Sequence, residues 1–198
     1  RRVTMARGLI SRLIDDPPPQ FVFELSEAGL AAARLDPKAP PRIGFQPFPP
    51  ETISVSPVRD NVLNPDGLAE AIAAFAPKTD KRTRAVLILP DFSVRVSVLD
   101  FDSFPAEPEQ QRSLVRFRIR KSLPFDIDSA SLSYHVQPNG KKCDVVVAVA
   151  PVEILARYEA PFRAAGFHPG IVTTSSLCAL EMAKGEGVSV MAKLSVRT

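Results

Sequence analysis

The chain has 198 residues, of which 45% are hydrophobic and 24% charged, and its formal net charge is +3. These values suit a soluble globular protein of one large or two small domains, and the charge is too small for a typical nucleic-acid-binding domain. Cys143 and Cys178 have no metal-binding or redox spacing, and no run of residues approaches the ~20 apolar positions of a transmembrane helix.

Residues 1–19 form a basic N-terminal arm that ends in a proline linker. The arm carries four arginines, and its apolar run at 8–10 is too short for the core of a signal peptide. Together with Leu13 and Ile14 this run could form a short amphipathic helix. Such a helix would lie on a membrane surface or pack on its own domain; an unordered arm is the remaining alternative.

Residues 20–90 predict a hairpin, a third strand, a helix and a buried strand. The expected strands span 21–25, 29–35, 43–48 and 84–89. Asn64 is a favourable N-cap and Pro65 a favourable first helical residue, so a helix is expected from there to Ala76. The last strand is apolar throughout, which is typical of a strand covered on both faces.

A basic segment over 112–122 follows an acidic turn and stops before Pro124. Apolar residues alternate with arginines along it, which is the period of a strand, whereas Val115, Ile119 and Leu123 share one face of a helix. The acidic start, the cations near the end and the proline stop favour the helix.

Around this helix the sequence predicts three antiparallel strands and a second helix. These elements are expected over 93–99, 131–137, 143–150 and 152–165. Asn139-Gly140 is a strong hairpin signal, and Gly166 is suited to cap the second helix. The helices are expected to bury Val115, Ile119, Leu155 and Phe162 against Val94, Val96 and Val146. Residues 168–172 then return the chain to the first subdomain. A helix over 174–184, packed through Leu177, Leu180 and Met182, follows, and 188–196 could be one more strand.

This order of weak motifs resembles the FtsA, PilM and GspL group of actin-like proteins, and above all PilM of the type IV pilus inner-membrane platform. The resemblance is carried by the acidic turn, the amphipathic helix, Pro124-Phe125-Asp126 and the strand with Tyr134. It implies an α/β fold with an actin-like (ribonuclease H-like) subdomain over 20–90 and 166–198. An inserted α+β subdomain, strand-helix-strand-strand-helix, spans 91–165. The family's second lobe has no counterpart, so the first lobe alone is expected.

The resemblance also implies a degenerate phosphate loop. In the family the first hairpin carries an Asp-Ile-Gly-type turn whose backbone amides approach phosphate. Here the stretch 23–29 reads FELSEAG: the aspartate is absent, the glycine is displaced and Glu27 would repel phosphate, so Ser26 alone matches. Asp126 and Asp128 lack the rest of a calcium loop. We therefore expect neither catalysis nor a cofactor nor a bound metal.

By resemblance, the protein is a non-catalytic cytoplasmic scaffold at the bacterial inner membrane. Its expected partner is the cytoplasmic N-terminal tail of a single-pass membrane protein (PilN in the pilus system), held in the groove between the two subdomains. The residues expected to bind it are Arg116, Arg120, Leu123 and Phe125. The apolar pair would supply affinity and the arginines orientation.

Several alternatives stay open. The protein could be the related GspL-like cytoplasmic domain of a type II secretion platform, or a nucleotide-binding actin-like ATPase. A pilus motor ATPase and a second copy of the chain are further partners to consider, whereas nucleic acid is not expected. The basic helix could also be only a solvated face.

Overall fold

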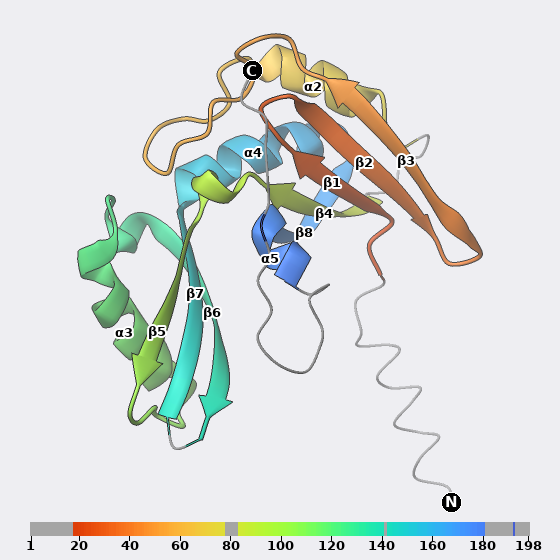
Figure 1. Ribbon diagram of the computed structural model, residues 1–198. Helices are drawn as coiled ribbons and strands as arrows, with labels where there is room; N and C mark the ends of the chain where they lie inside the picture. Colours follow the sequence, from red (N-terminus) through yellow and green to blue (C-terminus); the bar gives the residue numbers. More distant parts are fainter. Residues whose placement is uncertain (1–17, 78–82, 141, 181–191, 193–198) are drawn as a thin grey trace, which may run out of the picture.

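The structure, a computed structural model, describes residues 18–77, 83–140, 142–180 and 192. Two β-sheets organise it, and each has its own hydrophobic core (Figure 1). The strands of the larger sheet are β1 Phe21–Leu25, β2 Gly29–Asp36, β3 Ala39–Pro47, β4 Thr83–Leu89 and β8 Phe167–Thr174. Those of the smaller sheet are β5 Arg95–Phe101, β6 Ala130–Asn139 and β7 Lys142–Pro151.

The larger sheet is mixed, with the strand order β3-β2-β1-β4-β8. β1, β2 and β3 pair antiparallel, whereas β1 with β4 and β4 with β8 pair parallel. Helices α2 (Pro65–Ala73) and α4 (Val152–Ala164) cover one face. At the centre of that core Phe23 lies within 5 Å of the rings of both Phe162 and Phe167, so one strand residue joins the helix to the far strand.

Local sequence signals explain where the two helices begin and end. The side chain of Asn64 accepts a hydrogen bond of 2.9 Å from the backbone N–H of Gly67, which caps α2 as predicted. Gly166 has a φ of +88° just beyond α4, a conformation that costs glycine little. This left-handed residue ends the helix and turns the chain into β8.

The smaller sheet is antiparallel, with the strand order β5-β7-β6. Helix α3 (Pro108–Ile119), followed by 3-10 turns at Arg120–Ser122 and Ile127–Ser129, covers one of its faces. Val115 and Ile119 are buried there against Val145, Val147 and Val149. The helical reading of the basic segment is thus confirmed, and so is the hairpin, since Asn139 and Lys142 are paired.

The face of this sheet that packs on α3 is the opposite of the one expected. Val96 and Val98 lie on the uncovered face, 37% and 66% exposed, in register with Ala148 and Val146. Residues 145–149 are apolar at every position. This strand therefore has no alternation that would indicate whether its odd-numbered or its even-numbered residues face the helix.

The boundary of the inserted subdomain also needs correction. Helix α4 was expected to cover the inserted sheet, yet Ile154, Tyr158 and Phe162 are buried in the core of the larger sheet. The part of the chain with the second core therefore ends near Pro151. Leu155, expected in the insert, is half-buried beside the first core as well.

The remaining expectations concern strands and ends. β4 has fully buried residues at alternate positions and half-buried ones between, so one of its faces is only partly covered. α5 (Ser175–Leu180) is present, but Leu180 is exposed rather than packed. The N-terminal arm up to residue 17, Met182 and most of the expected strand over 188–196 lie outside the described residues.

Candidate functional site

Three segments meet at one end of the larger sheet: the β1–β2 turn, the chain after β4, and the start of α5. Ligands of open α/β sheets commonly bind at the carboxyl ends of parallel strands, which makes this end the natural place for a phosphate. The Ser26 hydroxyl accepts a bond of 3.2 Å from the N–H of Gly29 and donates to its carbonyl at 3.1 Å. The one residue that matches the phosphate loop is therefore engaged in closing its own turn.

Carboxylates dominate this end. Glu24 accepts a hydrogen bond from the hydroxyl of Ser175, and Asp91 accepts one of 2.8 Å from the N–H of Ser176. Glu27 accepts one of 3.2 Å from the N–H of Val55. Backbone and hydroxyl donors that could hold a phosphate are thus paired with negative groups of the protein, and an incoming phosphate would meet repulsion.

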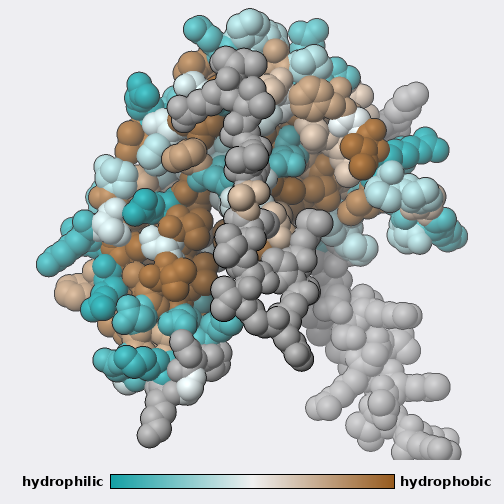
Figure 2. Space-filling model, in the orientation of Figure 1, coloured by the Kyte–Doolittle hydropathy of each residue, from teal (hydrophilic) through white to brown (hydrophobic). Residues whose placement is uncertain are grey.

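A hollow of about 380 Å³ lies beside this end, between the two subdomains. Its lining comes from the inserted sheet, α4, β8 and the start of α5. The lining residues are Val94, Ser131, Ser133, Ala148, Ala150, Leu155, Glu159, Val172, Thr173, Thr174 and Leu177. The uncovered face of the inserted sheet extends from it, and Figure 2 shows hydrophobic surface gathered over β5 and β7 there.

A buried polar network joins the subdomains where the insert leaves the first core. The hydroxyls of Ser93 and Tyr158 lie 3.1 Å apart, and Asn61 Nδ2 donates to Ser93 Oγ at 3.1 Å. Asn61 Oδ1 in turn accepts from the N–H of Ser56 at 2.8 Å. Burial raises the pKa of the Tyr158 phenol above its usual value of about 10. The phenol therefore keeps its proton. The network fixes the start of the insert against α4.

The four residues predicted to bind a partner do not line this hollow. Arg116 donates to the carbonyl of Ile127 at 3.1 Å and pairs with Asp128 at 2.7 Å. Leu123 and Phe125 pack against the second core, on the α3 side of the sheet, and Arg120 is exposed. The expectation that this segment forms a wall of the groove is wrong, because α3 covers the opposite face; whether these residues bind a partner stays a prediction.

The residues that sequence reasoning missed are the small and polar ones of the hollow. Ser131 and Ser133 alternate on β6 with the buried Leu132 and the half-buried Tyr134, a period that already assigns the serines to the uncovered face. The histidines take no part: His135 is exposed on the same strand and His168 is half-buried on β8. Among the described residues no group of three acidic, histidine or cysteine side chains could hold a metal ion.

Comparison with known proteins gives a fold. No protein-family model matches the sequence, and no curated protein matches it. Among solved structures, a PilM-PilN type IV pilus biogenesis complex superposes with a TM-score of 0.68 at 21% identity, covering 84% of this chain and 50% of that one. The chain has a PilM-like, actin-like fold. This confirms the resemblance and the fold class expected from the sequence.

A second similar structure is the cytoplasmic domain of EpsL, an inner-membrane component of the type II secretion system of Vibrio cholerae. Its TM-score is 0.53 at 13% identity, covering 78% of this chain and 56% of that one. The chain thus spans about half the length of these two structures. Within the described residues, no helix is both long enough and apolar enough to cross a membrane.

Proposed function

We propose that the protein is a non-catalytic scaffold of a pilus or secretion assembly platform, peripheral to the bacterial inner membrane. It binds the cytoplasmic N-terminal tail of a single-pass membrane partner. The observation that carries this proposal is the hollow between the subdomains, open to an uncovered apolar sheet face. The PilM-like fold supports it, since one similar structure is a complex of PilM with PilN.

An extended segment suits this surface. β6 is an edge strand of the inserted sheet, so its outer backbone groups can pair with an added strand. Across the open face, Val146 on β7 and Val96 and Val98 on β5, the opposite edge strand, offer apolar contacts to a segment that crosses the sheet. Glu159, the only charged side chain among the described residues that line the hollow, already pairs with Arg163 at 2.7 Å. We therefore expect apolar side chains of the tail to supply most of the affinity.

The absence of catalysis is the second half of the proposal. It is supported by the carboxylates of Glu24, Glu27 and Asp91, which take up donors where a phosphate would lie. A nucleotide-binding ATPase of the same fold would need those donors for its ligand.

Isothermal titration of the tail of a PilN-like protein tests the binding surface. Val98→Asp places a charge on the open sheet face and should weaken binding about tenfold or more, since about 1.4 kcal/mol of apolar contact would be lost. Leu63→Asp is the matched control, because Leu63 is similarly exposed, at 54%, but belongs neither to the open sheet face nor to the lining of the hollow. Failure of the tail to bind wild-type protein would remove the proposal.

The same titration decides between the two faces of the insert. Phe125→Ala and the double change Arg116→Glu, Arg120→Glu alter the α3 side. If these weaken capture and Val98→Asp does not, the tail lies on the helix-covered side. The likeness to the EpsL domain supports the GspL-like alternative. The tail of a type II secretion partner therefore serves as a second probe.

A further inference from the structure

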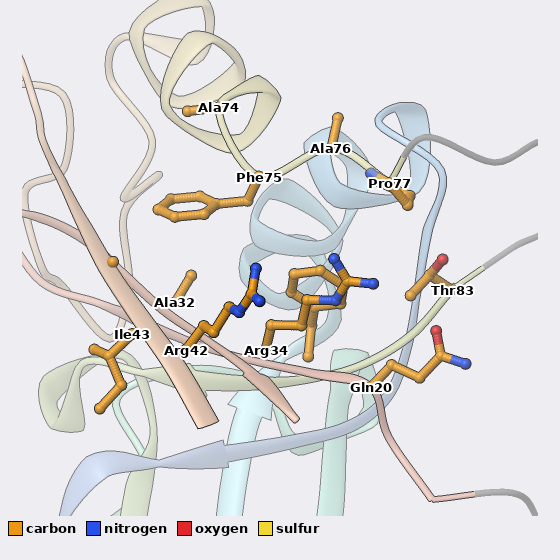
Figure 3. A pocket seen from close by; sticks show the side chains of 12 residues that line it. Gln20, Ala32, Arg34, Arg42, Ile43, Ala74, Phe75, Ala76, Pro77 and Thr83 are labelled. Carbon is orange, nitrogen blue, oxygen red and sulfur yellow. The ribbon is translucent and has the colours of Figure 1, made fainter. Parts of the chain in front are cut away.

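A second hollow, of about 600 Å³, lies between the β2–β3 hairpin and the end of α2. Figure 3 shows Arg34 and Arg42 reaching from the strands into the space beneath Phe75 and Ala76. No described residue lines both this hollow and the one between the subdomains. A ligand here would leave the proposed tail-binding surface free, so the inference goes beyond the proposed function.

The two arginines are direct partners across the antiparallel β2–β3 pair. Like charges placed directly opposite each other destabilise a sheet. Neither guanidinium forms an ion pair with a carboxylate in the part of the chain that the structure describes. The pair thus costs stability that an anion between the two side chains would return.

Arg34 is also held in place, and an apolar ring is fixed beside Arg42. The guanidinium carbon of Arg34 lies 5.9 Å from the centre of the Phe21 ring, a cation–π contact that limits its rotamers. Phe75 is set against Gly44 on the strand of Arg42, where any Cβ would come within 2.8 Å of the Phe75 ring. The two guanidinium groups, each able to donate a pair of hydrogen bonds, therefore lie beside the apolar ring of Phe75.

A simpler reading is that the arginines offset the partial negative charge at the end of α2. That role predicts hydrogen bonds to the last carbonyls of the helix, and within the described part of the chain neither Arg34 nor Arg42 donates one. It also predicts a loss of stability on removal of either charge, the opposite of what the opposed pair predicts.

We propose that the Arg34–Arg42 hollow binds an acidic segment of a protein partner, in which carboxylates flank an apolar side chain. The guanidiniums would hold the carboxylates in bidentate pairs, and the apolar side chain would lie against Phe75 and Pro77. A concave site with an apolar wall fits a peptide better than a flat bilayer surface. Among the described residues of the lining there are two cations, too few to follow a nucleic-acid backbone.

The test uses the whole chain and the acetylated peptide Asp-Glu-Phe-Asp-Leu-Glu. Calorimetric titration should show binding that weakens as salt is raised. Arg42→Gln and Arg34→Gln should each weaken it about fivefold or more, while Arg112→Gln, an exposed arginine on α3, should not change it. The neutral peptide Asn-Gln-Phe-Asn-Leu-Gln should bind far more weakly.

Thermal unfolding without ligand completes the test. Arg42→Gln should leave the melting temperature unchanged or raise it, whereas the acidic peptide should raise that of the wild type alone. A lowered melting temperature together with unchanged peptide binding would mean that the arginines serve α2 only, and would overturn the proposal. Binding of inorganic phosphate or phosphatidylglycerol vesicles with no binding of the peptide would overturn it as well.

Discussion

Ile119 and Phe117 lie two residues apart on α3 and show how sharply the helix divides into faces. Ile119 is 1% exposed in the second core, whereas Phe117 is 75% exposed. Ile119→Ala should lower the free energy of unfolding by about 2–5 kcal/mol, because it leaves a cavity in a packed core. Phe117→Ala should change it by less than about 0.5 kcal/mol. Urea unfolding followed by circular dichroism measures both; equal effects would show that the helix face is misassigned.

The buried phenol of Tyr158 should make the stability of the protein depend on pH. Its pKa is raised mainly by burial, so the folded protein holds the phenolic proton where the unfolded chain releases it. This contribution to stability is complete below about pH 10, the unfolded pKa, and is lost as the pH rises through the folded value. Tyr158→Phe removes it, together with about 1–3 kcal/mol from the broken network with Ser93.

The measurement is urea unfolding of both proteins between pH 8 and pH 11. The stability advantage of the wild type over Tyr158→Phe should be constant up to about pH 9 and shrink above pH 10. An advantage that stays the same to pH 11 would contradict a buried, neutral phenol.

The role of a single residue could be predicted where one local interaction determines that role. Asn64 caps α2 because a side-chain oxygen next to a free N–H is a short-range arrangement, readable from sequence. Arg116 was not: its partner Asp128 is twelve positions away and reaches it only after α3 and the following turn have formed. The basic cluster read as free cations therefore contains at least one that is already paired.

Among the elements, α4 marks the boundary of the insert, and deletions on either side of that boundary can test it. Arg95 and Val149 are partners across β5 and β7, so the chain enters and leaves the inserted sheet at neighbouring points. Replacing residues 96–148 by an Asn-Gly turn should preserve the first core, because α4 and its Phe162 remain. Removing 91–165 instead should abolish folding of that core. Chemical-shift dispersion in amide NMR spectra distinguishes the outcomes, and a folded 91–165 deletion would show that α4 is dispensable there.

Element types followed from local pattern, but their packing partners did not. The spacing of Tyr158 and Phe162 indicated which side of α4 is buried, and both are. It carried no information about which sheet they meet, since either sheet offers an apolar face. The apolar run of β7 likewise indicated a strand and left both parities equally suitable for the core.

The arrangement of the whole molecule depends on long-range pairing. The parallel neighbours β1, β4 and β8 come from distant parts of the chain, and the PilM-like order of elements anticipated their fold. The location of the hollow could be read only in part. The alternation of Ser131 and Ser133 with Leu132 indicates the face of β6 that α3 leaves open, whereas the elements that meet this face follow from packing.

The meeting of β1, β4 and β8 at one end of the sheet leads to the last prediction, which concerns nucleotide. Glu24 and Glu27 come from the end of β1 and the turn after it, whereas Asp91 follows β4, so the three carboxylates share this end only in the folded molecule. A triphosphate at this end would face their charge and find its donors occupied. Magnesium-ATP should therefore bind more weakly than about 10 μM, roughly −7 kcal/mol, in isothermal titration. The double change Glu24→Gln, Glu27→Gln removes two of the charges and should tighten any residual binding, while Glu153→Gln, an exposed carboxylate on α4, should not. Tight binding by the wild type would mean that magnesium or a rearranged turn overcomes this repulsion, and the scaffold would then have to be regarded as a nucleotide-dependent one.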